Sequence, residues 1–270
     1  MEIISGKIRI VNLYEAYSVV AGVIAELDGE YEFSPIEWID YEDVDYLSIV
    51  LKPQRYTLLH GYITSVYKYH LEYIVDKHFY DEVIEDLVKV FDTYEFNSDE
   101  LIDIKKEYEI SQLEDPDHRD NNKLVYRLLN YFEKTLLKYV VEDAFTVLYQ
   151  NKVFLRDFNL KIAELIIKFE QDDYPEVLSS NGVLRRCDYL PEWLKQGVFF
   201  RDKGRCQLCG TDLSRLLSND FEIHYDHIVP LNIGGTNDPT NFQLTCSKCN
   251  LIKGARNSNT KNIGSLFWDI

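Results

Sequence analysis

Cys206-Gln-Leu-Cys209 and Cys246-Ser-Lys-Cys249 are the two stretches that decide how the last third of this 270-residue chain folds. Each Cys-x-x-Cys turn can direct two thiolates at one ion, and two such turns complete a tetrahedral zinc site. A site closed by four protein ligands is typical of a structural zinc. In a reducing cytosol this spacing favours metal binding over disulfides, and over the alternative of merely buried or redox-active thiols. The fifth cysteine, Cys187, has no such partner, and we expect it to be structural.

The segment between the two cysteine pairs has the content of a small ββα unit. It contains Glu222-Ile-His-Tyr-Asp-His-Ile-Val-Pro-Leu231, then Gly234-Gly235, then Asn241-Phe-Gln-Leu244. Residues 223–229 are strand-like, and the glycine pair predicts a tight turn or loop. The segment from Cys246 onward predicts a short helix.

Together these features resemble the HNH, or ββα-metal, nucleases. The family pattern is an Asp-His pair, a Gly-Gly loop, an Asn before a hydrophobic strand, and a Cys-x-x-Cys-Asn-x-x-Lys ending. All of these occur in order within roughly residues 195–256, whereas the first 180 residues show no comparable resemblance. The resemblance implies metal-dependent hydrolysis of phosphodiester bonds, and we expect DNA to be the substrate.

The resemblance also implies a role for each residue of the motif. His227 would be the general base, for which an imidazole pKa near ~6.5 is well suited. Asp226 and Asn250 would hold a catalytic Mg²⁺ or Mn²⁺, since hard oxygen donors favour such ions. The family has either Asn or His at the position of Asn250, and the amide favours Mg²⁺ over zinc. Asn241 matches the position that orients the base.

Three further residues are candidates for nucleic-acid binding. Lys253 and Arg256 follow the motif on the predicted helix and could bind phosphates that flank the cut. An ordinary solvated basic face is an equal alternative. His224 lies two residues before Asp226, so strand alternation could bring both to one face. There His224 could assist the metal or a phosphate, although we favour a supporting role.

The first ~175 residues are predicted to be mainly helical. Residues 114–120 read as a loop by composition, and Ile36–Leu51 is ambiguous, with a possible short strand at Tyr46–Leu51. Of the 20 tyrosines, 18 lie before residue 175, and core packing explains them better than a protein interface. The predicted helices are Arg55–Val75, His78–Phe91, Asp99–Leu113, Leu124–Leu148, Asn159–Glu170 and, later in the chain, Pro191–Arg201.

The sign of the net charge changes near residue 180. The net charge of −17 combines −19 in the first 180 residues with +2 in residues 181–270. An acidic surface repels phosphates, so the first part is not the expected nucleic-acid surface. We therefore predict an α+β protein with a helical regulatory or partner-binding domain (1–175), a linker (176–190) and a zinc-clipped HNH nuclease domain (191–270). The partner would be another protein or a second copy, as in a prokaryotic antiviral defence system.

The first residues have no signal-peptide pattern, and no apolar run is long enough to span a bilayer, so we expect a cytoplasmic protein without membrane contact. Three alternatives remain at this stage. The first is a nuclease that cleaves RNA, and the second is a non-catalytic zinc module that only binds nucleic acid. The third is an adaptor in which the helical domain is the main function. Intact motif residues argue against the last two.

Overall fold

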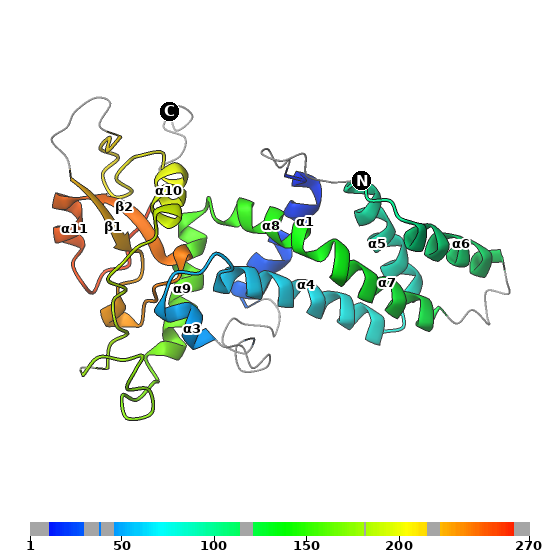
Figure 1. Cartoon of the computed structure of the whole chain (residues 1–270), viewed down its shortest axis with the longest axis horizontal. Helices are drawn as coiled ribbons and strands as arrows, with labels where there is room; N and C mark the ends of the chain where they lie inside the picture. Colours follow the sequence, from blue (N-terminus) through cyan, green and yellow to red (C-terminus); the bar gives the residue numbers. More distant parts are fainter. Residues whose placement is uncertain are drawn as a thin grey trace. The chain divides into compact units, whose positions relative to one another are not determined.

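The computed structural model describes residues 11–29, 38, 46–113, 121–180, 182–214 and 222–261. Figure 1 labels the helices and strands along the chain. The helices are α1 (Leu13–Leu27), α3 (Tyr46–Leu51), α4 (Leu58–Asp76), α5 (Tyr80–Thr93), α6 (Asp99–Leu113), α7 (Asn122–Thr135), α8 (Leu137–Leu148), α9 (Lys152–Ile166), α10 (Glu192–Arg201) and α11 (Ser247–Lys253). The strands are β1 (Ile223–His227) and β2 (Phe242–Cys246), and two short 3₁₀ turns lie between them at Leu231–Ile233 and Pro239–Asn241. The fold is thus mainly helical, with a small two-stranded sheet and a helix near the C-terminus, as predicted.

The chain forms two compact units, each built from two segments. The helical unit comprises Met1–Val23 and Ile63–Val147. The second unit, called here the sheet unit, comprises Ile24–Tyr62 and Leu148–Ile270. None of the described helices is long and apolar enough to cross a membrane.

The predicted linker at residues 176–190 lies inside the sheet unit. Leu178 and Leu184 pair there in an antiparallel bridge, and both side chains are buried. The units of the structure therefore do not coincide with the boundaries suggested by composition. The separate regulatory domain at residues 1–175 stays a prediction.

Apolar residues at helical spacing build the core of the helical unit. On α5, Leu87 and Phe91 are fully buried, and on α7 Leu128 and Phe132 are fully buried. The rings of Phe91 and Phe132 meet edge to face with their centroids 5.9 Å apart. In each helix the two buried residues are separated by one helical turn, which places them on one face.

The helix predicted over Leu124–Leu148 is in fact two helices, which was a wrong prediction. α7 ends at Thr135 and α8 begins at Leu137. The Thr135 hydroxyl donates to the carbonyl of Tyr131 at 2.6 Å, an interaction that bends helices. The apolar spacing continues through the break, so the pattern alone did not reveal it.

Two other predicted elements also need correction. Residues Tyr46–Leu51 form helix α3 and not a strand. α9 begins at Lys152, seven residues before the predicted start, because the Asn151 side chain accepts a hydrogen bond from the Phe154 amide and caps the helix. The loop predicted at residues 114–120 lies outside the described residues.

The sheet unit is centred on an antiparallel pair of strands. Ile223 lies opposite Cys246, and His227 lies opposite Phe242. Every residue of β2 is buried, and Phe242, Leu244 and Cys246 belong to a core cluster that includes residues of α10. This arrangement, with α11 directly after β2, is the predicted ββα order.

Helix α9 packs against the loop that joins the strands. A Cβ on Gly234 would lie 2.7 Å from the Ala163 carbonyl oxygen, and Gly234 has a φ of +88°, so only glycine fits there. Nearby, the Asn159 amide donates to the Thr240 hydroxyl at 3.1 Å. Although α9 belongs to the region predicted as regulatory, it supports the loop of the sheet unit.

A buried group of charges joins α10 to the sheet. Arg201 donates to both carboxylate oxygens of Asp202, at 2.8 and 3.2 Å. One of these oxygens also accepts from the Leu244 amide at 2.7 Å, and Lys152 at the start of α9 lies 3.9 Å from the other. Every partner is desolvated, so removal of one would leave an uncompensated buried charge.

Candidate active site and zinc cluster

The four cysteines of the two Cys-x-x-Cys turns meet at one point. The sulfur atoms of Cys206, Cys209, Cys246 and Cys249 all lie within 4.8 Å of one another. The Sγ atoms of Cys209 and Cys246 are 3.9 Å apart, close to the ~3.8 Å edge of a tetrahedron whose Zn–S bonds are about 2.3 Å. The cluster fits a structural zinc ion.

The surroundings of the thiols also suit a metal. The Cys249 amide donates a hydrogen bond to the Cys246 sulfur at 3.5 Å, and this bond stabilises negative charge on that sulfur. Burial raises the pKa of the Cys209 thiol, but hydrogen bonds from Thr211 and from neighbouring thiols outweigh it and lower that pKa to about 6. At least one ligand is therefore ionised at neutral pH, which is the form that binds metal.

Three of the four predicted catalytic residues line a cavity of about 450 Å³ beside the end of β1, and the fourth, Asn241, does not border it. Asp226, His227 and Asn250 all border it, together with Arg185 and Arg186. The structure thus brings together the three residues to which the resemblance assigned metal binding and base catalysis. Their chemical roles stay predictions.

The His227 ring is held by a residue that the sequence did not single out, Asn237. The Asn237 amide nitrogen donates to the carbonyls of Leu51, at 3.1 Å, and Arg185, at 2.8 Å. The other terminal atom must then be the oxygen, which accepts from the Cys187 amide and lies 3.2 Å from Nε2 of His227. Because an oxygen faces Nε2, that nitrogen carries the proton, and Nδ1 has the free lone pair.

The environment keeps this ring neutral. His227 is only 4% exposed, and its ring packs against Phe242 with centroids 4.5 Å apart. Burial, with the cations of Arg186 and Lys253, lowers the pKa of His227 to about 4, against a smaller raising effect of the Asn237 hydrogen bond. At neutral pH the imidazole is therefore able to accept a proton.

The change Asn237→Asp is expected to move the acid limb of the pH–rate profile to higher pH, by about 1 unit or more. An aspartate still accepts from Nε2, but its negative charge favours the imidazolium and so raises the pKa of His227. Since the base must be neutral, the variant needs a higher pH for the same rate.

The control is Asn232→Asp, which adds the same charge at an exposed position bordering the same cavity. Melting temperatures show whether each variant folds, because Asn237→Asp also loses two donors. Equal profiles for the two variants would contradict the role given to Asn237.

Asn241 acts on the backbone after His227 and not on the ring. Its side-chain oxygen accepts from the Val229 amide at 2.8 Å, and its nitrogen donates to the carbonyls of Val229 and Thr236, both at 2.9 Å. The Ile228 amide donates to the Asn241 carbonyl. Any orienting effect of Asn241 on His227 therefore passes through the main chain.

The carboxylate of Asp226 is held by two side chains. Lys253 Nζ lies 2.9 Å from its Oδ2, and the Gln243 amide donates to the same oxygen at 3.2 Å. Lys253 is 1% exposed at its side chain and also donates to the His227 carbonyl at 2.6 Å. Lys253 thus faces the protein interior, a position that gives no support to the predicted phosphate contact. Oδ1 of Asp226 remains for a metal, with Asn250 on the same cavity.

His224 and Arg256 differ in their positions. Arg256 is exposed just beyond α11, where a phosphate could reach it. His224 is half-buried on β1, and its Nε2 lies 3.6 Å from a carboxylate oxygen of Glu222. That position suits a supporting residue. Nucleic-acid binding by either one stays a prediction.

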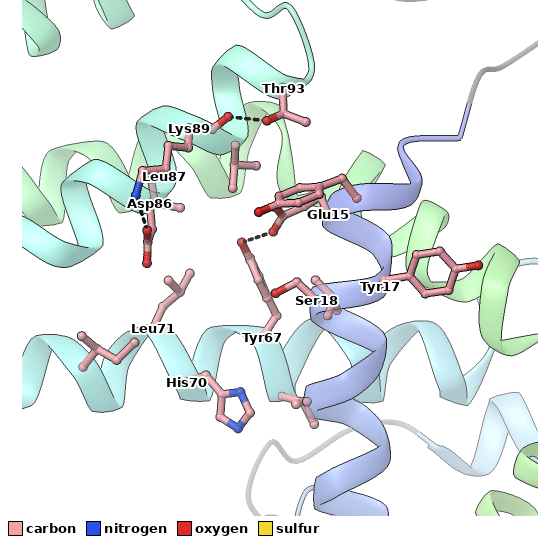
Figure 2. Close-up of a pocket in the computed structure, with 16 residues that line it drawn as sticks. Glu15, Tyr17, Ser18, Tyr67, His70, Leu71, Asp86, Leu87, Lys89 and Thr93 are labelled. Carbon is pink, nitrogen blue, oxygen red and sulfur yellow. Dashed lines mark hydrogen bonds and ion pairs between the residues drawn. The ribbon is translucent and has the colours of Figure 1, made fainter.

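A separate cavity of about 700 Å³ lies within the helical unit, between α1, α4 and α5 (Figure 2). There the Tyr67 hydroxyl donates to Glu15 at 3.2 Å, and the two side chains point toward each other. Burial raises the pKa of Glu15, and the Tyr67 hydrogen bond lowers it by less. Tyr67 here fills a core edge and satisfies a buried carboxyl group, in line with the packing role expected for the tyrosines.

Comparison with known proteins supports the assignment for one segment. Residues 206–256 match the family model described as HNH endonuclease. The match contains both Cys-x-x-Cys turns, both strands and α11, and it confirms the resemblance seen in the sequence. It indicates a module that cleaves or binds nucleic acid. No curated protein and no solved structure matches the chain significantly.

Proposed function

We propose that this chain is a metal-dependent HNH endonuclease that hydrolyses phosphodiester bonds in DNA. The observation that carries the proposal is the placement of His227: its Nε2 is held by Asn237, and it borders one cavity together with Asp226 and Asn250. A module that only binds nucleic acid has no need of a buried imidazole with an oriented lone pair.

In the proposed reaction, Nδ1 of His227 takes a proton from a water molecule. The water oxygen forms a bond to phosphorus while the bond from phosphorus to the leaving sugar oxygen breaks, so no covalent enzyme intermediate forms. Asp226 and Asn250 are oxygen donors that would hold Mg²⁺ or Mn²⁺, which when bound supplies charge stabilisation for the leaving oxygen. One such site cuts one strand, so double-strand cleavage requires a dimer or two successive cuts.

The test is cleavage of supercoiled plasmid DNA by the full chain in Mg²⁺ and in Mn²⁺, with EDTA as the control. Nicking that requires the divalent ion, and returns when it is restored, supports the proposal. The same assay on single-stranded RNA tests the alternative that the substrate is RNA. Binding of nucleic acid without cleavage in any metal would favour a non-catalytic zinc module.

The acidic helical region is proposed to restrain or direct the nuclease. The supporting observation is the contrast between −19 in residues 1–180 and +2 in the remainder. Repulsion of this kind would make activity depend on a protein partner or a second copy, as expected in an antiviral defence system of a prokaryote. The zinc thiolates suit the reducing cytoplasm, where we place the protein.

Removal of acidic charge from the helical unit is expected to speed cleavage several-fold at low salt. Suitable changes are Glu82→Gln, Asp103→Asn and Glu109→Gln, all at exposed positions. The gain should vanish at high salt, since exposed charges are screened beyond about 8 Å at physiological ionic strength. Initial rates at several salt concentrations measure this. A variant that is no faster than the native chain at low salt would rule out electrostatic restraint.

A further inference from the structure

Arg186 is an exposed cation at the edge of the catalytic cavity. Among the described residues, its guanidinium has no hydrogen bond or ion pair. Arg186 borders both the cavity of Asp226 and His227 and a second cavity of about 680 Å³. Its neighbour Arg185 borders both cavities too, but donates to the carbonyls of Leu178 and Pro175.

The backbone at Arg186 is fixed to the residue that holds the catalytic ring. The carbonyl before it, of Arg185, accepts from the Asn237 amide at 2.8 Å. The amide after it, of Cys187, donates to the Asn237 oxygen at 3.2 Å. That same oxygen faces Nε2 of His227. One buried side chain therefore sets the position of Arg186 relative to His227, while the guanidinium stays accessible.

The charges around Arg186 suit an anion. On the catalytic cavity the carboxylate of Asp226 is already paired with Lys253, so the charge of Arg186 is not neutralised there. The positive charge of Arg186 reaches His227, whose pKa it helps to lower. The border of the second cavity includes Lys52 and the carboxylates of Glu176 and Asp188, which precede the HNH motif in the chain.

We propose that Arg186 binds a phosphate of the substrate strand next to the bond that is cut. The inference rests on the proposed function and adds a substrate contact from outside the segment that matches the family. A guanidinium presents paired donors that match two phosphate oxygens, and backbone anchoring lowers the entropy lost when it binds.

The experiment measures binding of a short fluorescein-labelled DNA duplex to the full chain at several salt concentrations. All variants carry His227→Ala, and Mg²⁺ is present, so the duplex is not cut during the measurement. We expect Arg186→Gln to weaken binding about tenfold, the effect of one charge-assisted hydrogen bond. The slope of log affinity against log salt should become smaller by about 1, as for one lost phosphate contact.

The matched control is Arg156→Gln, a half-buried arginine of α9 that pairs with Asp157. Arg186→Lys retains the charge without the paired donors and should recover part of the affinity. Equal affinity and slope for the Arg186→Gln and Arg156→Gln proteins would overturn the proposal, as would absence of any DNA binding. A plasmid assay on chains with native His227 separates the two claims. If Arg186→Gln alone weakens DNA binding but the native chain does not cut the plasmid, only the proposed nuclease activity is refuted. If the native chain cuts the plasmid but Arg186→Gln does not change DNA binding, only the phosphate contact is refuted.

Discussion

In Mg²⁺, plasmid cleavage by the full chain is expected to fall about 10²- to 10⁴-fold when His227 is replaced by alanine, the usual contribution of a general base. Burial lowers the pKa of His227 to about 4, its Nε2 faces the Asn237 oxygen, and in the proposed mechanism its Nδ1 takes the proton from water. The alanine variant retains Asp226 and Asn250, so its metal binding should persist while its chemistry fails.

The control is His224→Ala, which removes an imidazole from the same strand, three residues earlier. Initial rates of nicking, normalised to the zinc content of each protein, give the comparison. If the His227→Ala protein retained more than a tenth of the native rate, another group would have to be the base.

The pH dependence of the native chain provides an independent check on the base. His227 is active when neutral, so the rate should fall only as the pH drops through about 4. The same shift has a consequence for folding, because the unfolded imidazole has a pKa near ~6.5. Between about 6.5 and about 4 the unfolded chain binds a proton that the folded chain does not, so stability is lost as the pH falls through this range. Denaturant melts across these pH values measure it.

Replacement of Cys206 by serine is expected to abolish zinc binding and unfold the sheet unit. Cys206 is fully buried in the core beside Leu194 and Phe242, and a structural zinc contributes on the order of 10 kcal/mol in small domains. Without the ion, three thiols and the ends of β2 and α10 lose their common anchor. Cleavage should disappear along with the folded sheet unit.

The matched control is Cys187→Ser, because the Cys187 sulfur contacts the Tyr189 carbonyl and is not in the cluster. Zinc content per chain and the number of thermal transitions distinguish the two proteins. Far-ultraviolet circular dichroism should retain much of its helical signal in Cys206→Ser, since the helical unit has its own core. Native zinc content and melting in Cys206→Ser would show that the cluster does not need four thiolates.

The sequence predicted the cysteine cluster, the ββα order and the grouping of Asp226, His227 and Asn250 because short motifs and the HNH resemblance mark these residues. The residues of a Cys-x-x-Cys turn, an alternating strand or an Asp-His pair can be recognised from their spacing in the sequence. Asn237 could not be found in this way. It sits in a Gly-Gly-Thr-Asn-Asp loop that resembles an ordinary turn, and its partners at Leu51 and Arg185 are far away in sequence.

The errors along the helices have the same origin. Tyr46–Leu51 contains β-branched and aromatic residues that favour a strand. The carbonyls at its C-terminal end nevertheless accept hydrogen bonds from Asn237. The Asn237 backbone amide donates to Val50 at 2.9 Å, and its side-chain amide donates to Leu51 at 3.1 Å. At the break after α7, the Thr135 hydroxyl donates to the Tyr131 carbonyl and so competes with the helix backbone. Such contacts outweigh local propensity and leave no periodic signal.

The contacts of the interstrand loop with α9 and α3 have a consequence for how the HNH segment can be transferred between proteins. The loop packs against α9 at Gly234, and Asn237 donates to the carbonyl of Leu51 at the end of α3, yet both helices precede residues 191–270. A gene fusion or recombination event that transferred only the C-terminal portion would leave these supports behind. The module that would have to be transferred is therefore discontinuous in sequence, because it combines residues 206–256 with α3 and α9, which lie earlier in the chain.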